Sequence, residues 1–209
     1  MLVVIRFRIG ESLRFLSHAE TIRVFQRACV RAGVQIAYSQ GFNPHQRMSL
    51  VPPRSVGVES DDDLLCLWLK EGQTAIDAEA LKSVLPGGIE IISAETSEAK
   101  NIPEPISARY VMKVQGQKIY DGVKKRIADV LASDKFVVNR RAGEDSRTKP
   151  VDVRPFLEAI QAEPEGFTVD CKIIPKGTIR VDEILGLLQL KTADLIGPVR
   201  RTSVQWKGI

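Results

Sequence analysis

Residues 38–49, with the sequence YSQGFNPHQRMS, carry the densest cluster of polar and aromatic side chains in the chain. Aromatic rings can stack on a base, amides can hydrogen-bond the edge of a base, and an arginine can contact a phosphate. Side chains of these kinds hold an unpaired nucleotide. The same composition also suits a connection between two strands, in which Phe42 anchors the loop and Asn43-Pro44 makes the turn. The candidate binding residues of this cluster are Tyr38, Gln40, Phe42, Asn43, His45 and Arg47.

A second candidate site lies where a helix is expected to begin. Ser17 and Glu20 have the spacing of a capping box, in which both residues satisfy backbone N–H groups of the first turn. The remaining N–H groups and the positive end of the helix dipole attract anions. Ser17 and His18, with Arg14 just before them, would therefore suit a phosphate. A plain capping box is the alternative, and the two interpretations are compatible.

The sequence does not indicate a catalytic or metal-binding group. His18 and His45 are its two histidines, and neither has cysteine or carboxylate partners at the spacing of a metal site. The three cysteines show no CxxC spacing, and the chain has neither a glycine-rich phosphate loop nor a nucleophile–base pair. We therefore expect no catalytic residue, no metal and no cofactor in this chain.

The net charge of +4 hides a basic–acidic–basic distribution. Residues 1–58 hold eight arginines, no lysine and two acidic residues, residues 59–108 hold three basic and eleven acidic residues, and residues 109–209 hold nineteen basic and thirteen acidic residues. The arginine-rich part favours a polyanion, most naturally RNA, although a solvated face is the alternative. The acidic part, residues 59–108, could be a solubilising face or a docking face for a basic partner, and reversing the charges of Asp61, Asp62 and Asp63 would test docking. A second basic strip could be formed by Arg140, Arg141, Arg147, Lys149, Arg154, Arg200 and Arg201, although a solvated face is the more common role of such a run.

Composition also bounds the class of protein. An apolar content of 44% without an apolar run near 18 residues favours a soluble globular protein that does not enter the membrane. The first ten residues are too short and too charged for a signal peptide, so we expect a cytoplasmic location.

Hydrophobic periodicity predicts that each half of the chain runs approximately β-α-β-β-α-β. In the first half we expect strands at 2–9, 34–39, 47–51, 63–69 and 89–95, with helices at 18–32 and 76–85. In the second half we expect strands at 108–114, 135–140 and 167–174, an extended segment at 151–160, a last strand at 199–206, and helices at 120–131 and 181–189. The predicted class is α+β, with two tandem ferredoxin-like (split β-α-β) domains that have antiparallel sheets. They occupy residues 1–95 and 107–209, joined by a linker at 96–106.

Four segments carry a resemblance to a known family. They are RFLSHAE at 14–20, RACVRAG at 27–33, AYSQGFNPH at 37–45 and GVES at 57–60. This pattern resembles the radical-SAM-linked protein family, which is a domain of unknown function. The similarity is dense over residues 6–60 and weaker toward the end of the chain. Ala19-Glu20, where the family has an apolar residue and Asp, and Gln46 depart from the pattern.

The resemblance implies an association with a radical SAM protein, either encoded beside this chain or fused to it. The iron–sulfur cluster would lie in that partner, because this chain lacks the closely spaced cysteine triad that holds such a cluster. We therefore predict a non-catalytic accessory or substrate-binding module. It would present RNA, either tRNA or rRNA, to a separate radical SAM enzyme for modification.

Two other functions remain open. Tandem ferredoxin-like domains resemble the CRISPR repeat-processing endoribonucleases, in which His18 or His45 would move a proton without a metal. Arg14 or Arg47 would then stabilise the charge on the phosphate. The chain lacks the glycine-rich C-terminal loop of that group. The other alternative is a protein-interaction adaptor that binds no nucleic acid.

Overall fold

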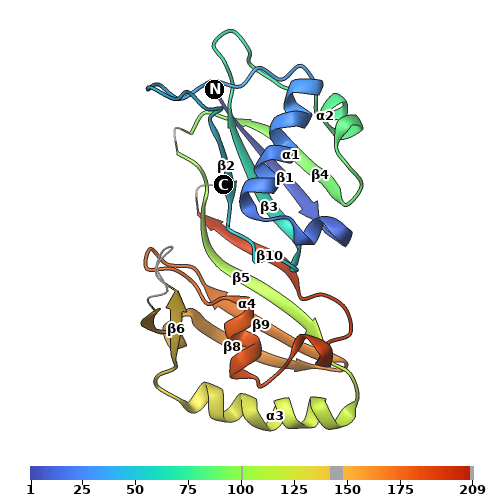
Figure 1. The fold of residues 1–209 in the computed structure, drawn as a ribbon, viewed down its shortest axis with the longest axis vertical. Coiled ribbons are helices and arrows are strands. Elements are labelled where there is room, and N and C mark those ends of the chain that lie inside the picture. Colours follow the sequence, from blue (N-terminus) through green and yellow to red (C-terminus); the bar gives the residue numbers. More distant parts are fainter. Residues whose placement is uncertain (100, 142–147, 208–209) are drawn as a thin grey trace. The chain divides into compact units, whose positions relative to one another are not determined.

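The computed structural model describes residues 1–99, 101–141 and 148–207, and these fold as two compact units. Unit 1 comprises Met1–Pro105 with the C-terminal residues from Trp206, and unit 2 comprises Ile106–Gln205. Both units combine helices with antiparallel strand pairs (Figure 1). The predicted α+β class with antiparallel pairing is therefore confirmed.

Unit 1 is a sheet with two helices on one face (Figure 1). Its sheet has the order β4-β1-β3, and β2 pairs with β3 on the other side from β1. A 3-10 turn, η1 (Glu11–Phe15), precedes the first helix. The elements are β1 (Leu2–Ile9), α1 (His18–Arg31), β2 (Met48–Val51), β3 (Glu59–Trp68), α2 (Ala78–Val84) and β4 (Ile89–Ser97).

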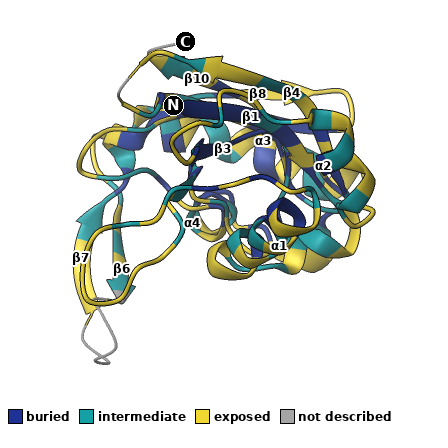
Figure 2. Cartoon of the chain, turned by 90° about the horizontal axis from the view of Figure 1, so that it is seen from above, coloured by how far each residue is buried: buried dark blue, intermediate teal, exposed yellow. Residues whose placement is uncertain are grey.

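Side chains that alternate along β1 build two apolar layers in unit 1. Those of Val3, Ile5, Phe7 and Ile9 face the helices, and those of Leu2 and Val4 join a smaller cluster that includes Leu64 and Cys66. The ring of Phe7 meets that of Phe25 on α1 edge-on, with centroids 4.8 Å apart. Figure 2 shows the result, with β1 buried and the outer side of α1 exposed. The inner side of α1 is thus held firmly while its outer side is free for contacts.

Local signals place the ends of α1 where the sequence predicts them. Ser17 is the N-cap and forms a complete capping box with Glu20. Gly33 follows the helix at φ 71°, a conformation that glycine adopts without the steric penalty of a Cβ atom. The predicted strand at 34–39 is wrong, because this segment forms only the isolated pairs Ile36↔Leu69 and Tyr38↔Gln46. The chain leaves the sheet there to make a loop, and Pro44 has no N–H to extend a ladder.

Unit 2 has the strand order β10-β5-β9-β8, with a separate β6-β7 hairpin. The predicted extended segment at 151–160 is broken at Pro155 by a 3-10 turn, η2 (Arg154–Phe156). The polar sequence AGEDSRT at 142–148 predicts a loop, and this segment lies almost wholly outside the described residues. β4 and β5 extend into the segment 96–106 that the sequence predicts as a linker. The elements are β5 (Glu104–Lys113), α3 (Gln117–Ala132), β6 (Val137–Arg141), β7 (Thr148–Asp152), β8 (Leu157–Glu163), β9 (Gly166–Lys172), α4 (Val181–Leu187), η3 (Thr192–Asp194) and β10 (Arg200–Lys207).

The arginines expected to form a second basic strip are largely used inside the protein. Arg154 donates to the carbonyls of Leu131, Ser133 and Leu157, at 2.9–3.0 Å. Arg201 is buried, with 1% of its surface exposed. Arg141 and Arg147 lie where the side chains are not described. Arg154 and Arg201 therefore do not contribute to a basic surface, whereas Lys149 and Arg200 are exposed.

Arg140 and Glu183 form a bidentate pair that joins β6 to α4, with both N···O distances 2.7 Å. Burial raises the pKa of the Glu183 carboxyl, but the hydrogen bonds from Arg140 and from the backbone N–H of Arg180 lower it, and the net pKa is below its ordinary 4.5. A carboxylate of lowered pKa stabilises the fold above its unfolded-state pKa, and this stabilisation is lost as pH falls through the folded-state pKa.

Replacing Glu183 with glutamine should therefore destabilise the protein in a pH-dependent way. At neutral pH we expect a loss of about 2 kcal/mol, because the side chain is only 8% exposed and its charged hydrogen bonds are lost. The difference from wild type should shrink below about pH 4.5. Urea unfolding across this pH range measures it, with the exposed Glu158→Gln as control. A difference that stays constant with pH would contradict the role of the charged pair.

The three cysteines, Cys29, Cys66 and Cys171, are free and buried. Burial raises the pKa of the Cys66 thiol to about 11 and that of the Cys29 thiol to about 12. The pKa of the Cys171 thiol is also raised to about 12, and burial is the largest cause. Because only the thiolate is nucleophilic, we expect none of them to react with Ellman's reagent in the native protein at pH about 8. All three should react in denaturant. Rapid modification of one thiol in the native state would show that its side chain is accessible.

Within the described residues, no helix is both long enough and apolar enough to cross a membrane.

Candidate nucleic-acid interface

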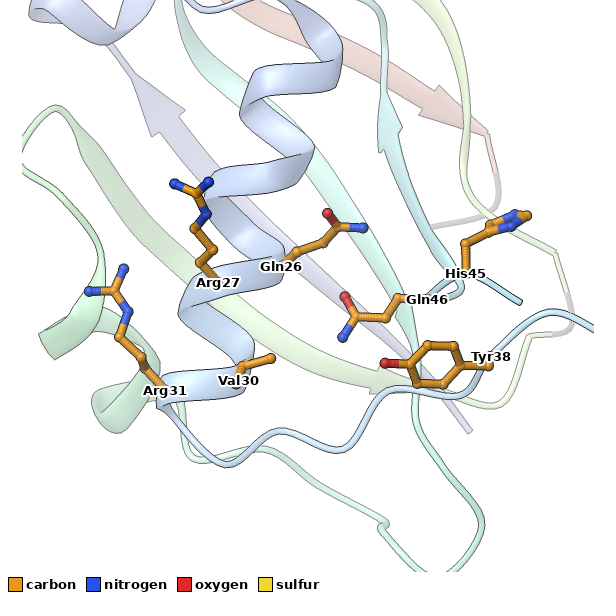
Figure 3. A pocket seen from close by; sticks show the side chains of 7 residues that line it. All are labelled: Gln26, Arg27, Val30, Arg31, Tyr38, His45 and Gln46. Atoms are coloured by element: carbon orange, nitrogen blue, oxygen red, sulfur yellow. The ribbon is translucent and has the colours of Figure 1, made fainter. Parts of the chain in front are cut away.

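An open pocket lies between the outer side of α1 and the loop that follows it (Figure 3). Its volume is about 590 Å³. The side chains of Tyr38 and Gln46 point toward the helix, and those of Gln26 and Val30 point back toward the loop. We call residues 38–46 the pocket loop. The lining residues are Gln26, Arg27, Val30, Arg31, Tyr38, His45 and Gln46.

The pocket loop is closed at its base by paired contacts between Ser39 and His45. The backbone N–H of Ser39 donates to the carbonyl of His45 at 2.8 Å, and the N–H of His45 donates to the Ser39 hydroxyl at 3.1 Å. Just outside this closure, Tyr38 and Gln46 form a bridge. The loop therefore presents Tyr38 and Gln46 side by side at the pocket. Phe42 lies at its apex.

The imidazole of His45 is oriented by the loop itself. Its Nδ1 lies 3.2 Å from the carbonyl oxygen of Asn43 and 3.2 Å from the hydroxyl of Ser39. Because a carbonyl only accepts, Nδ1 carries the proton in the neutral ring and Nε2 is left as the acceptor. In Figure 3 the ring turns away from α1, so His45 borders the pocket and does not fill it.

Three arginines four residues apart, Arg23, Arg27 and Arg31, form what we call the arginine stripe of α1. All three are exposed. Arg23 acts electrostatically on Glu20, where it helps to lower the pKa of that carboxyl after the larger effects of hydrogen bonds from Ser17. Arg27 and Arg31 make no hydrogen bond or ion pair with any residue in the described ranges. Residues four apart on a helix lie on one side of it, so the stripe is a continuous positive surface.

Four of the other five arginines among residues 1–58 contrast with the stripe. Arg6 pairs with Asp62 at 3.0 Å and Arg8 with Glu90 at 3.2 Å. Arg14 donates to the carbonyl of Glu11 at 2.7 Å, and Arg54 is almost wholly buried. The arginines of this basic segment therefore fall into two groups, one with partners inside the protein and one on its surface. These four arginines interact with carboxylates or backbone carbonyls of the protein itself, whereas the stripe is available to a ligand.

The second predicted site lies at the far end of α1 from the pocket. His18 precedes Val30 by twelve residues, a helical rise of about 18 Å. The Ser17 hydroxyl and N–H both donate to the carboxylate of Glu20, at 2.7 and 2.8 Å. That carboxylate places a negative charge where the phosphate was expected. The structure therefore does not bring Arg14, Ser17 and His18 together with the pocket loop.

The remaining predicted residues have different surroundings. Gln40, Phe42 and Asn43 are exposed on the pocket loop. The guanidinium of Arg47 lies 4.8 Å from the ring of Trp68, which packs on the side of the sheet away from the helices. Tyr38 and His45 line the pocket, whereas Arg47 does not.

Two of the three acidic residues at 61–63 are buried. Asp62 and Asp63 are 7% and 1% exposed, and they interact with Arg6 and with Ser60 and Arg54 respectively. Asp61 lies 3.9 Å from Arg8. Asp62 and Asp63 therefore belong to the interior of the fold, and reversing their charges would disrupt folding before it tested docking.

Five pocket residues were not among the predicted site residues, namely Gln26, Arg27, Val30, Arg31 and Gln46. The four-residue spacing of Arg23, Arg27 and Arg31 is a signal that could have found the stripe. Val30, an apolar residue on the exposed side of α1, marks the same surface. No group of three or more His, Cys, Asp or Glu side chains suited to a metal ion occurs in the part of the chain that the structure describes.

A family model described as "Uncharacterized protein conserved in bacteria (DUF2344)" matches residues 3–186. The chain belongs to the DUF2344 family. The match includes α1, the pocket loop and most of unit 2, so the candidate interface lies inside the family region. None of the curated proteins matches the chain. Among solved structures, the chain is similar to the crystal structure of an unknown protein from Galdieria sulphuraria. The match covers 90% of this chain and 87% of the Galdieria chain, with 12% sequence identity and a TM-score of 0.26. Because this TM-score is low, the similarity is not used to infer the fold of the DUF2344 chain.

Proposed function

We propose that this DUF2344 chain is a non-catalytic accessory module that binds RNA and presents it to a separate radical SAM enzyme. The observation that carries the RNA proposal is the arginine stripe, whose Arg27 and Arg31 have no protein partner within the described residues, beside an open pocket that contains Tyr38. Exposed positive charge without a protein partner, next to an exposed aromatic ring, suits a ligand with phosphates and bases.

The dimensions of the stripe fit a nucleic-acid backbone. Residues four apart on a helix are separated by a rise of about 6 Å. This is close to the spacing of consecutive phosphates along one strand, so each guanidinium can contact a different phosphate. Tyr38 can then stack on a base, and the amides of Gln26 and Gln46 can hydrogen-bond its edge. Single-stranded or looped RNA supports these contacts best, because its bases are accessible.

The radical SAM partner rests on the resemblance carried by residues 14–20, 27–33, 37–45 and 57–60. The cysteines of this chain are separated by 37 and 105 residues, and all three are buried. They do not form the cysteine triad of a radical SAM cluster, so the cluster and its chemistry belong to the partner in this proposal. We further propose tRNA or rRNA as the ligand and the cytoplasm as the location.

We also propose that each unit is a ferredoxin-like, split β-α-β fold. Numbering the strands of the split motif in chain order, unit 1 has the order 4-1-3-2, as β4-β1-β3-β2. Unit 2 has the same order as β10-β5-β9-β8, with the β6-β7 hairpin inserted after α3. Both orders, together with the alternation of strands and helices, support tandem copies of one architecture.

The test is ultraviolet crosslinking of the purified protein to RNA recovered with it from a native lysate. We expect nucleotide adducts on peptides that contain the pocket loop or α1, and a radical SAM protein in the same purification. Mass spectrometry locates the adducts, and sequencing identifies the RNA. Adducts spread evenly over exposed peptides such as those of α3, or an RNA-free preparation, would overturn RNA binding. Absence of any radical SAM protein would overturn the partnership separately.

A further inference from the structure

Phe42 has the most exposed large apolar side chain described in the chain, with a relative exposure of 112%. Scattered apolar residues on a surface need no special explanation. Phe42 differs because it lies at the apex of the pocket loop, four residues from Tyr38, which is itself 58% exposed. Four residues span at most about 14 Å of chain, so the two rings are within reach of neighbouring nucleotides.

The loop presents this ring on a firm base. The contacts between Ser39 and His45 close the loop below the apex, and the Nδ1 of His45 also binds the carbonyl of Asn43. Gly41 has φ 145°, a conformation that side-chain-bearing residues rarely adopt, and Pro44 restricts the other flank. The Ser39–His45 closure and Pro44 restrict the turn, Gly41 permits the backbone conformation that the turn needs, and the side chain of Phe42 is left exposed. A projecting apolar ring on a constrained loop is suited to insertion into a ligand.

We propose that Phe42 is a wedge that enters between two stacked bases of an RNA and that the displaced base lies against Tyr38 in the pocket. The inference rests on the proposed RNA function and deepens it, because it assigns the ligand class as a looped or stem-end RNA. Apolar side chains that part base steps act in this way in nucleic-acid complexes. The arginine stripe holds the phosphates beside the parted step, and its charge favours RNA over an apolar protein groove as the occupant.

The experiment uses an RNA hairpin that carries one 2-aminopurine at the junction of stem and loop. Its fluorescence rises when the base leaves the stack. Saturating wild-type protein should raise the fluorescence several-fold, and Phe42→Leu, which keeps an apolar wedge, should do the same. Phe42→Ser should leave the fluorescence near that of free RNA. Its affinity should fall by no more than about 10-fold, because the arginine stripe remains.

A second variant tests the fate of the displaced base. Tyr38→Ala should give a larger fluorescence rise than wild type, because the base is displaced but no longer stacked on a ring, and a rise equal to that of wild type would overturn the placement of the base against Tyr38. Ile196→Ser, at an exposed apolar residue of unit 2, is the matched control and should behave as wild type.

The outcomes separate the wedge from the proposed function. If wild-type protein does not bind the hairpin in fluorescence anisotropy, RNA binding and the wedge both fail. If wild type and Phe42→Ser bind and give equal fluorescence, the wedge is overturned while RNA binding stands. If Phe42→Ser gives the wild-type fluorescence and loses a co-purifying protein, Phe42 is a protein-docking residue and the wedge is overturned.

Discussion

Replacing Arg54 with methionine should lower the free energy of unfolding of the protein by about 3 kcal/mol. The Arg54 side chain is 5% exposed and donates to the carbonyls of Arg14 and Val58, both at 2.7 Å, and to that of Leu16 at 3.3 Å. Its Nε also lies 3.9 Å from the buried carboxylate of Asp63. Methionine keeps the apolar stem but removes every one of these donors. The carbonyls and the carboxylate would then be buried with fewer hydrogen-bond partners, and this lowers the stability of the folded state.

Urea unfolding followed by circular dichroism measures this loss. The matched control is Arg27→Met, which removes the same charge from a residue with no hydrogen bond or ion pair in the described parts. We expect the control to stay within about 0.5 kcal/mol of wild type. Equal stability of the two variants would show that Arg54 does not hold the connection between η1 and α1 against the segment before β3.

Replacing Arg23, Arg27 and Arg31 together with glutamine should weaken RNA binding by about 100-fold at 0.1 M salt. Each phosphate contact on a single strand contributes about 0.7 to the slope of log affinity against log salt, so the triple variant should lose about 2 from that slope. Glutamine preserves helix propensity and the hydrogen-bonding capacity of the surface. Fluorescence anisotropy with a labelled single-stranded RNA over a series of salt concentrations measures both quantities.

The control for the stripe is the triple replacement of Lys118, Lys124 and Lys125 with glutamine. These lysines are exposed on α3 of unit 2, and their replacement removes the same total charge as that of the three arginines. We expect the control to retain most of the affinity, because only charge close to the bound phosphates releases counterions on binding. If both triple variants lose affinity equally, attraction to net charge explains binding and the α1 surface is not a specific site.

Local chemistry explains which parts of the fold could be predicted. The capping box of Ser17 and Glu20 and the glycine at position 33 define the ends of α1 through contacts within a few residues, and both appear as expected. The alternating residues of β1 likewise predict a strand, because the period of two is a property of the backbone. The strand expected at 34–39 does not form, because strand pairing depends on a distant partner and the β-rich composition supplies none.

The pocket loop was predicted as a cluster from its composition alone, and its closure by Ser39 and His45 is a short-range contact of the same kind. The division of the arginines was not predictable in this way. Arg6 and Asp62 are 56 residues apart in the sequence, and Arg54 binds carbonyls as many as 40 residues away. An arginine that is neutralised inside the fold and one that faces solvent have the same appearance in a sequence.

Composition, capping and periodicity were therefore sufficient for the α+β class, the helix α1 and the chemical character of residues 38–49, because each follows from neighbours along the chain. The tertiary structure decided that the pocket is completed by the outer side of α1 and not by the residues around Ser17. It also decided that Arg27 and Arg31 are free of protein partners in the described residues while Arg54 is buried. These outcomes depend on which distant groups folding brings within hydrogen-bonding distance, and local chemistry does not specify that.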